Sequence, residues 1–225
     1  MTEEFIEQRA SDIESRAEIA AASARAGAEV AVESFRTTLE VEHKSGKTDV
    51  VTRADRRAQE AVVDRIRSHD TGATVVGEEN DAAQAVPESG TVWVVDPIDG
   101  TNNFVRGDRN WATSVACLVD GNPVAAANIL PALGDSYVGT PEGVTLNDDP
   151  VSVSSRSDPE RFAVTPTIWW EFDRREEYAA VLEAIVSRFG DLRRVGSAQA
   201  SLSLLAGWND SLVIDNEDKS VVAHF

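Results

Sequence analysis

Cysteine and long apolar runs are both scarce in this sequence. A single cysteine among 225 residues excludes an internal disulfide and a zinc site built from cysteines. No apolar stretch is long enough to span a bilayer, and the sequence opens with the acidic string Met-Thr-Glu-Glu rather than a basic signal start. We therefore expect a cytoplasmic protein that has no membrane partner.

Positive charge is scarce as well. The chain has 39 acidic and 21 basic residues, a formal net charge of −18. Binding to duplex nucleic acid needs a basic footprint, so we expect no nucleic-acid partner. Only three basic residues are lysines, and such an acidic, lysine-poor composition resembles proteins of halophilic, salt-accumulating organisms, in which molar salt screens repulsion within about 3 Å. An ordinary acidic bacterial enzyme is the alternative.

Apolar residues make up 42% of the chain, enough to bury a core. Helical periodicity marks residues 3–35 and 54–68, separated by a polar loop at 42–49. The string Asp-Gly-Asn-Pro at 120–123 predicts a hairpin turn. Strand patterns occupy 74–76, 91–95, 112–119, 124–130 and, more weakly, 137–139 and 151–154.

From residue 161 the pattern alternates in the order β-α-β-α-β, which is typical of a layered α/β half. Strands are predicted at 162–164, 192–195 and 211–214, and helices at 175–189 and 197–205. Gly190 is the predicted C-cap of the first of these helices. We expect one domain over residues 1–225, with an N-terminal lobe at 1–145 and a C-terminal lobe at 146–225.

Three carboxylates stand at the ends of two predicted strands: Glu78 after the first, and Asp96 and Asp99 after the second. The second strand is apolar on both faces, so we expect it inside the sheet, where carboxyl ends of strands form sites. Pro97 keeps Asp96 out of the helical region. This predicts a sharp turn that lets Asp96 and Asp99 point into one pocket.

The residues after these acids suit a phosphate. Gly100 allows the backbone to approach a ligand closely, and Thr101 is predicted to open a short helix whose N–H groups suit a phosphate oxygen. Converging negative charge is costly unless a cation neutralises it. Since all candidate ligands are oxygens, Mg²⁺ or Mn²⁺ is favoured over zinc or copper. The alternative is an acidic helix cap with solvated glutamates.

The strings Gly-Glu-Glu-Asn at 77–80 and Trp-Val-Val-Asp-Pro-Ile-Asp-Gly-Thr-Asn-Asn-Phe at 93–104 resemble the inositol monophosphatase family. That lithium-sensitive family includes archaeal enzymes that also act on fructose 1,6-bisphosphate. Lys-Ser at 44–45, the segment 49–55 and Gly-Ser-Ala at 196–198 support the resemblance, which covers about residues 5–215. It implies an α/β (α+β) fold, a layered α-β-α-β-α sandwich, and a homodimer.

The resemblance also implies roles for individual residues. Two or three Mg²⁺ ions would be held by oxygen ligands, namely Glu78, Asp96, the Ile98 carbonyl and Asp99. Thr101 and Asp55 would orient and activate the attacking water, and Glu79 would assist at a weaker metal site. The substrate would be contacted by Gly100 and Thr101 at its phosphate and by Gly196 and Ser197 at its ring hydroxyls. Ser197 is also a good helix N-cap in its own right.

The family's last metal ligand is an aspartate near the C-terminus, in a Trp-Asp-x-Ala-Ala-Gly helix. The nearest stretch here, residues 218–225, places Lys219 at that position, or Asp218 if the alignment is shifted by one. A truncated or frame-shifted copy, a diverged active enzyme, and a homologue that has lost its second metal are the three explanations.

We expect a Mg²⁺-dependent phosphomonoesterase that acts on a small phosphorylated metabolite. An inositol monophosphate is the leading substrate, followed by fructose 1,6-bisphosphate and a 3′-phosphorylated nucleotide. The hypothesis of another class is a non-catalytic homologue that binds a phosphorylated ligand or a partner subunit. An aspartate facing Asp96 and Asp99 from the C-terminal region favours the enzyme, and Lys219 there favours the binding protein.

Overall fold

The computed structural model describes residues 3–38, 41–43, 50–78, 86–155, 157–167, 172–207, 211–214 and 221–222. The chain divides into two compact units, Met1–Pro150 and Val151–Phe225. The single domain that we predict, with lobes at 1–145 and 146–225, stays a prediction. None of the helices in the described ranges combines the length and apolar character that crossing a membrane requires.

The first unit is built around a mixed sheet. Its helices are α1 (Glu3–Ser34), α2 (Arg53–His69) and α3 (Thr101–Arg106). Its strands are β1 (Val41–His43), β2 (Val50–Thr52), β3 (Thr74–Gly77), β4 (Thr91–Asp99), β5 (Ala112–Val119), β6 (Asn122–Leu130), β7 (Asp135–Thr140), β8 (Gly143–Leu146) and β9 (Asp149–Val151). Strands β3 to β9 form a seven-stranded sheet in chain order, and β1 and β2 form a separate two-stranded sheet.

Strand β4 lies inside the sheet, as predicted. It pairs in parallel with β3 on one side and antiparallel with β5 on the other. Strands β5 and β6 form the predicted hairpin, in which Asp120 and Gly121 have φ angles of 50° and 75°. Two consecutive positive φ angles are the signature of a type I′ turn, whose twist matches that of paired strands.

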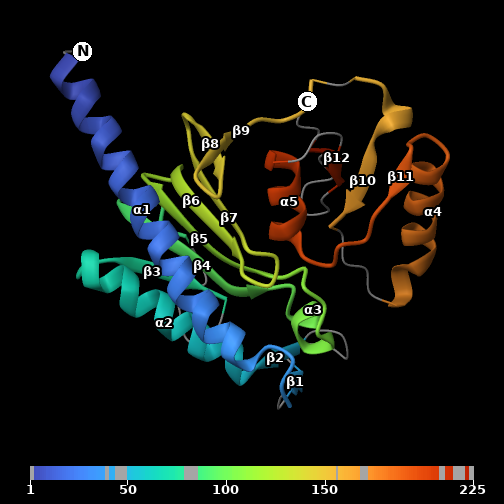
Figure 1. Ribbon diagram of the computed structural model, residues 1–225, viewed down its shortest axis with the longest axis horizontal. Helices are drawn as coiled ribbons and strands as arrows, with labels where there is room; N and C mark the ends of the chain where they lie inside the picture. Colours follow the sequence, from blue (N-terminus) through green and yellow to red (C-terminus); the bar gives the residue numbers. More distant parts are fainter. Residues whose placement is uncertain are drawn as a thin grey trace. The chain divides into compact units, whose positions relative to one another are not determined.

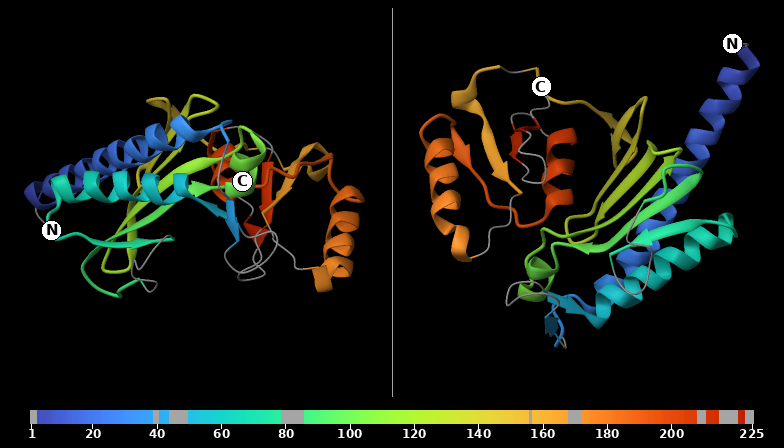
Figure 2. Two further views of the ribbon diagram at one scale, coloured as in Figure 1. Left: turned by 90° about the horizontal axis from the view of Figure 1, so that it is seen from below. Right: turned by 180° about the vertical axis from the view of Figure 1, so that it is seen from behind.

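Helices α1 and α2 cover one face of this sheet (Figures 1 and 2). Trp93, Val95, Val115 and Cys117 from β4 and β5 are buried against a stripe of alanines in α1. Small side chains let the long helix approach the strands closely. Because side chains alternate along a strand, Val94 and Asp96 point to the face of the sheet away from these helices.

The second unit has the predicted β-α-β-α-β order. Its elements are η1 (Pro159–Arg161), β10 (Ala163–Pro166), η2 (Phe172–Arg174), α4 (Arg175–Val186), β11 (Asp191–Leu192), α5 (Ala198–Gly207), β12 (Ser211–Ile214) and β13 (Val221–Val222). Strand β10 pairs in parallel with β11 and β12, and β13 is antiparallel to β12. Parallel strands joined by helices are the layered α/β arrangement that the sequence pattern predicts.

Two predictions for this unit were wrong in detail. Helix α4 is capped by Ser187, not by Gly190, and strand β11 has two residues rather than four. After Val186 the Arg188 and Phe189 amides still donate to the Ile185 carbonyl, so the chain leaves the helix through a tight turn. Gly190 serves another purpose, because a Cβ there would collide with the Glu160 carbonyl.

Candidate active site

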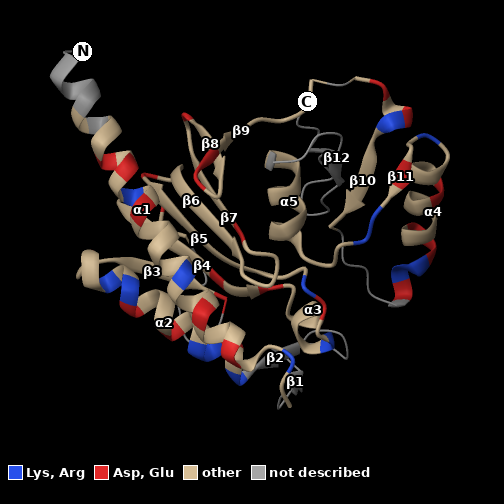
Figure 3. Ribbon diagram, in the orientation of Figure 1, with Lys and Arg blue, Asp and Glu red and all other residues tan. Residues whose placement is uncertain are grey.

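The acidic residues gather where β3 and β4 end. Gly77 pairs with Val95, and the Glu78 amide donates a hydrogen bond to the Val95 carbonyl at 3.2 Å. This register places Glu78, which is exposed, beside Asp96 on the neighbouring strand. The structure thus brings together the two strand ends that the sequence marked as acidic, and Figure 3 shows the acids of β4 in red.

We predicted a sharp turn at Asp96, and this prediction was wrong. Strand β4 continues to Asp99 through a β-bulge, because Asp96 pairs with Ser114 and Asp99 with Ala112. β4 advances three residues while β5 covers two. In a regular strand, residues three apart face opposite sides of the sheet, and one extra residue restores a common side. The bulge therefore does what we had assigned to a turn.

Asp96 is the electrostatic centre of the site. Burial raises the pKa of its carboxyl group well above the usual value, and the nearby charges of Asp99, Glu78 and Asp55 raise that pKa further. Its carboxyl group also shares a hydrogen bond with the Glu78 side chain. Asp96 Oδ1 is buried and has no hydrogen-bond partner among the described residues. Each of these neighbours favours the neutral carboxyl, so a cation would be strongly stabilising here.

Helix α2 contributes Asp55 from its first turn. Asp55 is 1% exposed, and its Oδ1 lies 3.2 Å from Thr101 Oγ1. The Thr101 hydroxyl also lies 3.0 Å from the Ile98 carbonyl. With a single proton, this hydroxyl donates to one of the two acceptors at a time. The pairing of Thr101 with Asp55 that the resemblance implied is present.

Gly100 joins the strand to α3. Its φ of 87° lies in the left-handed region, which a residue with a side chain adopts only at a cost. The Gly100 carbonyl accepts from the amides of Asn103 and Phe104 at 2.8 and 3.0 Å. The predicted short helix is confirmed, and these two amides are already engaged. The contact of Gly100 and Thr101 with a phosphate stays a prediction.

Helix α3 is anchored from outside the motif. Phe104 packs edge-on against Trp111, with ring centroids 4.9 Å apart, and also against Phe35 at the end of α1. The Arg36 guanidinium donates two hydrogen bonds, at 3.0 and 2.9 Å, to the carbonyl of Gly107, the C-cap of α3. This packing holds α3, and with it Thr101, in place.

The donor set fits a hard divalent cation. Carboxylate and carbonyl oxygens from Glu78, Asp96, Asp99 and Ile98 are the ligand type that Mg²⁺ prefers. In the described ranges, no three carboxylate, histidine or cysteine side chains already have the arrangement that would hold an ion. Glu79 lies outside the described residues.

In the second unit, Ser197 is a helix N-cap. Its Oγ accepts a hydrogen bond from the Ala200 amide at 3.0 Å, and Ser197 is 3% exposed. Gly196 precedes it with a φ of 80°. The capping role that we predicted is confirmed, and the contact with substrate stays a prediction. Asp218 and Lys219 lie outside the described residues.

Sequence reasoning missed two residues that shape the site. Gln59 is 5% exposed and packs so closely against Gly77 that a Cβ there would lie 2.5 Å from Gln59 Oε1. Thr113, fully buried in β5, donates a hydrogen bond to the Pro97 carbonyl at 2.8 Å. Gln59 could have been found from its position four residues after Asp55, on the same face of α2. Thr113 stands out only as a polar residue in an apolar strand.

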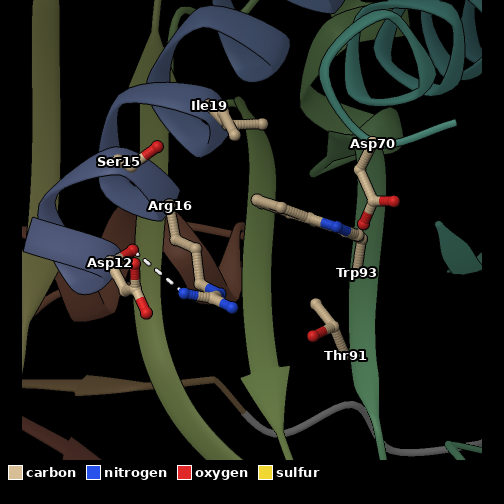
Figure 4. Close-up of a pocket in the computed structure, with 7 residues that line it drawn as sticks. All are labelled: Asp12, Ser15, Arg16, Ile19, Asp70, Thr91 and Trp93. Carbon is tan, nitrogen blue, oxygen red and sulfur yellow. Dashed lines mark hydrogen bonds between the residues drawn. The ribbon is translucent and has the colours of Figure 1, made fainter. Parts of the chain in front are cut away.

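The other end of β4 carries a cavity of about 260 Å³ (Figure 4). It is lined by Asp12, Ser15, Arg16, Ile19, Asp70, Thr91 and Trp93. Arg16 Nη1 donates to the Asp12 carbonyl at 3.1 Å, and the Asp70 carboxylate accepts from the Gly72 amide at 3.2 Å. Charges of both signs meet here, and local hydrogen bonds engage them.

An α/β layered fold with carboxylates gathered at the end of an interior strand is the kind of arrangement in which metal-assisted hydrolysis of phosphate esters takes place. The comparison with known families makes this specific. The sequence profile of the inositol monophosphatase family matches residues 12–215, and this chain belongs to that family.

Individual relatives agree with this assignment. The inositol-1-monophosphatase of Bacillus subtilis is 29% identical over 168 residues, which are 74% of this chain and 63% of that protein. The fructose-1,6-bisphosphatase/inositol-1-monophosphatase of Thermotoga maritima is 31% identical over 70% of this chain and 59% of that protein. The solved structure of a Thermotoga maritima IMPase superposes with a TM-score of 0.77 at 26% identity, over 88% of this chain and 76% of that one. The match to these two curated relatives spans about three fifths of their length. The structural similarity confirms the predicted α/β sandwich.

Proposed function

We propose that this chain is a Mg²⁺-dependent phosphomonoesterase that acts on an inositol monophosphate or a related sugar phosphate. One observation carries the proposal: Asp96, whose Oδ1 is buried and has no partner among the described residues, lies among three other carboxylates beside a left-handed glycine turn. Such crowding costs stability unless a positively charged ligand is bound there. Membership of the inositol monophosphatase family supports this assignment.

The residues would divide the work as follows. Glu78, Asp96, Asp99 and the Ile98 carbonyl would hold the metal, and Glu79 would assist at a further weaker site. When bound, Mg²⁺ neutralises charge on the phosphate and lowers the pKa of a water molecule. The Ile98 carbonyl has two lone pairs, so it can accept from Thr101 and still bind a cation.

Thr101 and Asp55 would orient the attacking water. When the Thr101 hydroxyl donates to Asp55, its oxygen lone pairs are left to accept a hydrogen bond from that water. Asp55 is buried, so the direction of the hydroxyl is set by the protein rather than by solvent. Gly100 and Thr101 would contact the phosphate, and Gly196 and Ser197 the ring hydroxyls of the substrate.

The substrate order is an inositol monophosphate, then fructose 1,6-bisphosphate, then a 3′-phosphorylated nucleotide. The relative from Thermotoga maritima carries both of the first two activities in its name, which supports placing them first. We also propose a cytoplasmic homodimer whose ligand is a small metabolite.

The test is phosphate release from myo-inositol 1-phosphate and fructose 1,6-bisphosphate, with and without Mg²⁺, at low and high KCl. Mg²⁺-dependent release, lost in Asp99→Asn, is the expected result. If the folded protein releases no phosphate yet binds inositol phosphate in calorimetry, the non-catalytic binding protein is the better description. Activity that rises with KCl would favour the halophilic alternative over an ordinary acidic enzyme.

A further inference from the structure

The bulge in β4 interrupts the regular pairing with β5 at Pro97 and Ile98. Pro97 and Ile98 both stand opposite Thr113 alone, because the pairing jumps from Asp96–Ser114 to Asp99–Ala112. Proline has no N–H, so it suits a bulge. The bulge carbonyls still need donors, since a buried carbonyl without a partner is destabilising.

A threonine hydroxyl lies against each of these carbonyls, although the Thr101 hydroxyl donates either to Ile98 or to Asp55. Thr113 Oγ1 donates to the Pro97 carbonyl at 2.8 Å, and Thr101 Oγ1 lies 3.0 Å from the Ile98 carbonyl. Thr101 is part of the proposed catalytic machinery, whereas Thr113 comes from the neighbouring strand. Thr113 therefore holds the bulge independently of the reaction.

Packing fixes the direction of the Thr113 hydroxyl. The residue is fully buried, and its γ-methyl faces Gly27 of α1, where a Cβ would come within 3.1 Å of it. β-branched side chains have few χ1 rotamers, so placing the methyl group also places the hydroxyl. On the far side β5 is held by β6, where Thr113 pairs with Ile129.

We propose that Thr113 is a positioning residue: by holding the Pro97 carbonyl it maintains the bulge that keeps Asp96 and Asp99 on one face of the sheet. A regular pairing of β4 with β5 would send these two aspartates to opposite faces. The consequence for cation binding rests on the proposed function. The consequence for the shape of β4 does not.

Two substitutions separate the hydroxyl from the methyl group. Thr113→Val keeps the shape and the packing against Gly27 but removes the donor, whereas Thr113→Ser keeps the donor and removes the methyl. We expect Thr113→Val to weaken Mn²⁺ binding, measured by electron paramagnetic resonance, by about 10–100-fold, as for other residues that orient metal ligands. Thr113→Ser should keep the affinity of the unsubstituted protein, although it loses heat stability.

Thr165→Val is the matched control. Thr165 is a strand threonine that is 3% exposed, in β10 of the second unit. Its substitution should alter thermal stability without changing Mn²⁺ affinity. This control separates a local effect on the bulge from a general loss of stability.

Each outcome decides the inference. If Asp96→Asn loses Mn²⁺ binding and Thr113→Val does not, the proposed function stands and the role of Thr113 is overturned. If Thr113→Ser loses as much affinity as Thr113→Val, packing rather than the hydroxyl matters, and the role is again overturned. If the unsubstituted protein binds no Mn²⁺, the proposed function fails, and a crystal structure of Thr113→Val decides instead. A shifted β4–β5 pairing there supports the role of Thr113, and an unchanged bulge removes it.

Discussion

The two ends of β4 treat charge in opposite ways. At the amino end, Arg16 stands among Asp12 and Asp70 in one cavity, and local hydrogen bonds engage the charges. At the carboxyl end, every neighbour in the described part of the chain that shifts the pKa of Asp96 is another acid. Mixed charges stabilise a fold by themselves, whereas crowded like charges need something from outside. The carboxyl end of β4 is therefore where we expect a ligand to bind.

The test with the largest expected effect replaces one aspartate at each end of β4 by asparagine. Asp99→Asn should lower turnover of inositol monophosphate by at least about 100-fold, since even residues that only orient metal ligands cost 10–100-fold. The fold should survive, because the change removes a charge that repels Asp96. Asp70→Asn, at the other end, should leave turnover unchanged. Steady-state kinetics on both variants measures the difference, and equal effects would mean that the contrast has no functional content.

Thr101→Ala should have the next largest effect. Its hydroxyl is placed to orient a water, and such groups typically contribute about 100-fold or more to the rate. We expect kcat to fall much more than Mg²⁺ affinity does, with Thr101→Ser restoring activity. Comparing kcat with the Mg²⁺ dissociation constant tests this. Losses of equal size would indicate that Thr101 only supports the Ile98 carbonyl.

The raised pKa of Asp96 predicts the direction of a pH effect. The folded protein holds a proton on Asp96 at pH values where the unfolded chain, with a value near 3.8, has lost it. Without metal, the folded state thus binds more protons, and its stability falls as pH rises from 3.8 toward the folded-state pKa.

Mg²⁺ should reverse this trend. It binds the carboxylate form, so its affinity should rise with pH over the same window, by up to about tenfold per pH unit for one displaced proton. Thermal unfolding with and without Mg²⁺ measures both effects, and Asp96→Asn should remove this residue's contribution to each. A metal-free protein with the same pH profile before and after that substitution would contradict the assignment.

The smallest expected effect concerns the approach of α2 to β3. Gly77→Ala would place a Cβ 2.5 Å from Gln59 Oε1, and overpacking of this kind costs about 1–3 kcal/mol of stability. In the double variant with Gln59→Ala the cost should be less than the sum of the single costs. Gly139→Ala is the control, because its Cβ would meet Val144 at an ordinary 3.6 Å. Additive changes in the free energy of unfolding would mean that Gln59 does not position Gly77 and Glu78.

The acidic site was predictable from sequence because its residues lie close together along the chain. Asp96, Asp99, Gly100 and Thr101 form one short string, and a continuous apolar run showed that a strand precedes it. The bulge was not predictable, since a proline that excludes the helical region is compatible with either a turn or an irregular strand. Only the register of β4 against β5 distinguishes the two.

The residues that escaped sequence reasoning act over long separations. Thr113 reaches Pro97 across strands, and Gln59 reaches Gly77 across a helix and a strand. Short strands such as β1, β8 and β13 were also missed, because two to four residues carry too little alternation to mark a strand. The local sequence pattern thus predicted the longer helices and strands, whereas the contacts between them depend on strand register, which the pattern does not contain.

The burial of Cys117 has a practical consequence for labelling. Its side chain is fully buried beside Trp93, and burial raises the pKa of its thiol to about 11. Maleimides and most disulfide reagents attack the thiolate, so this thiol should stay silent near neutral pH. A cysteine introduced at an exposed position would then carry a spin label or fluorophore alone, without removal of the native residue. The native protein therefore needs no cysteine replacement before a single labelled cysteine is introduced.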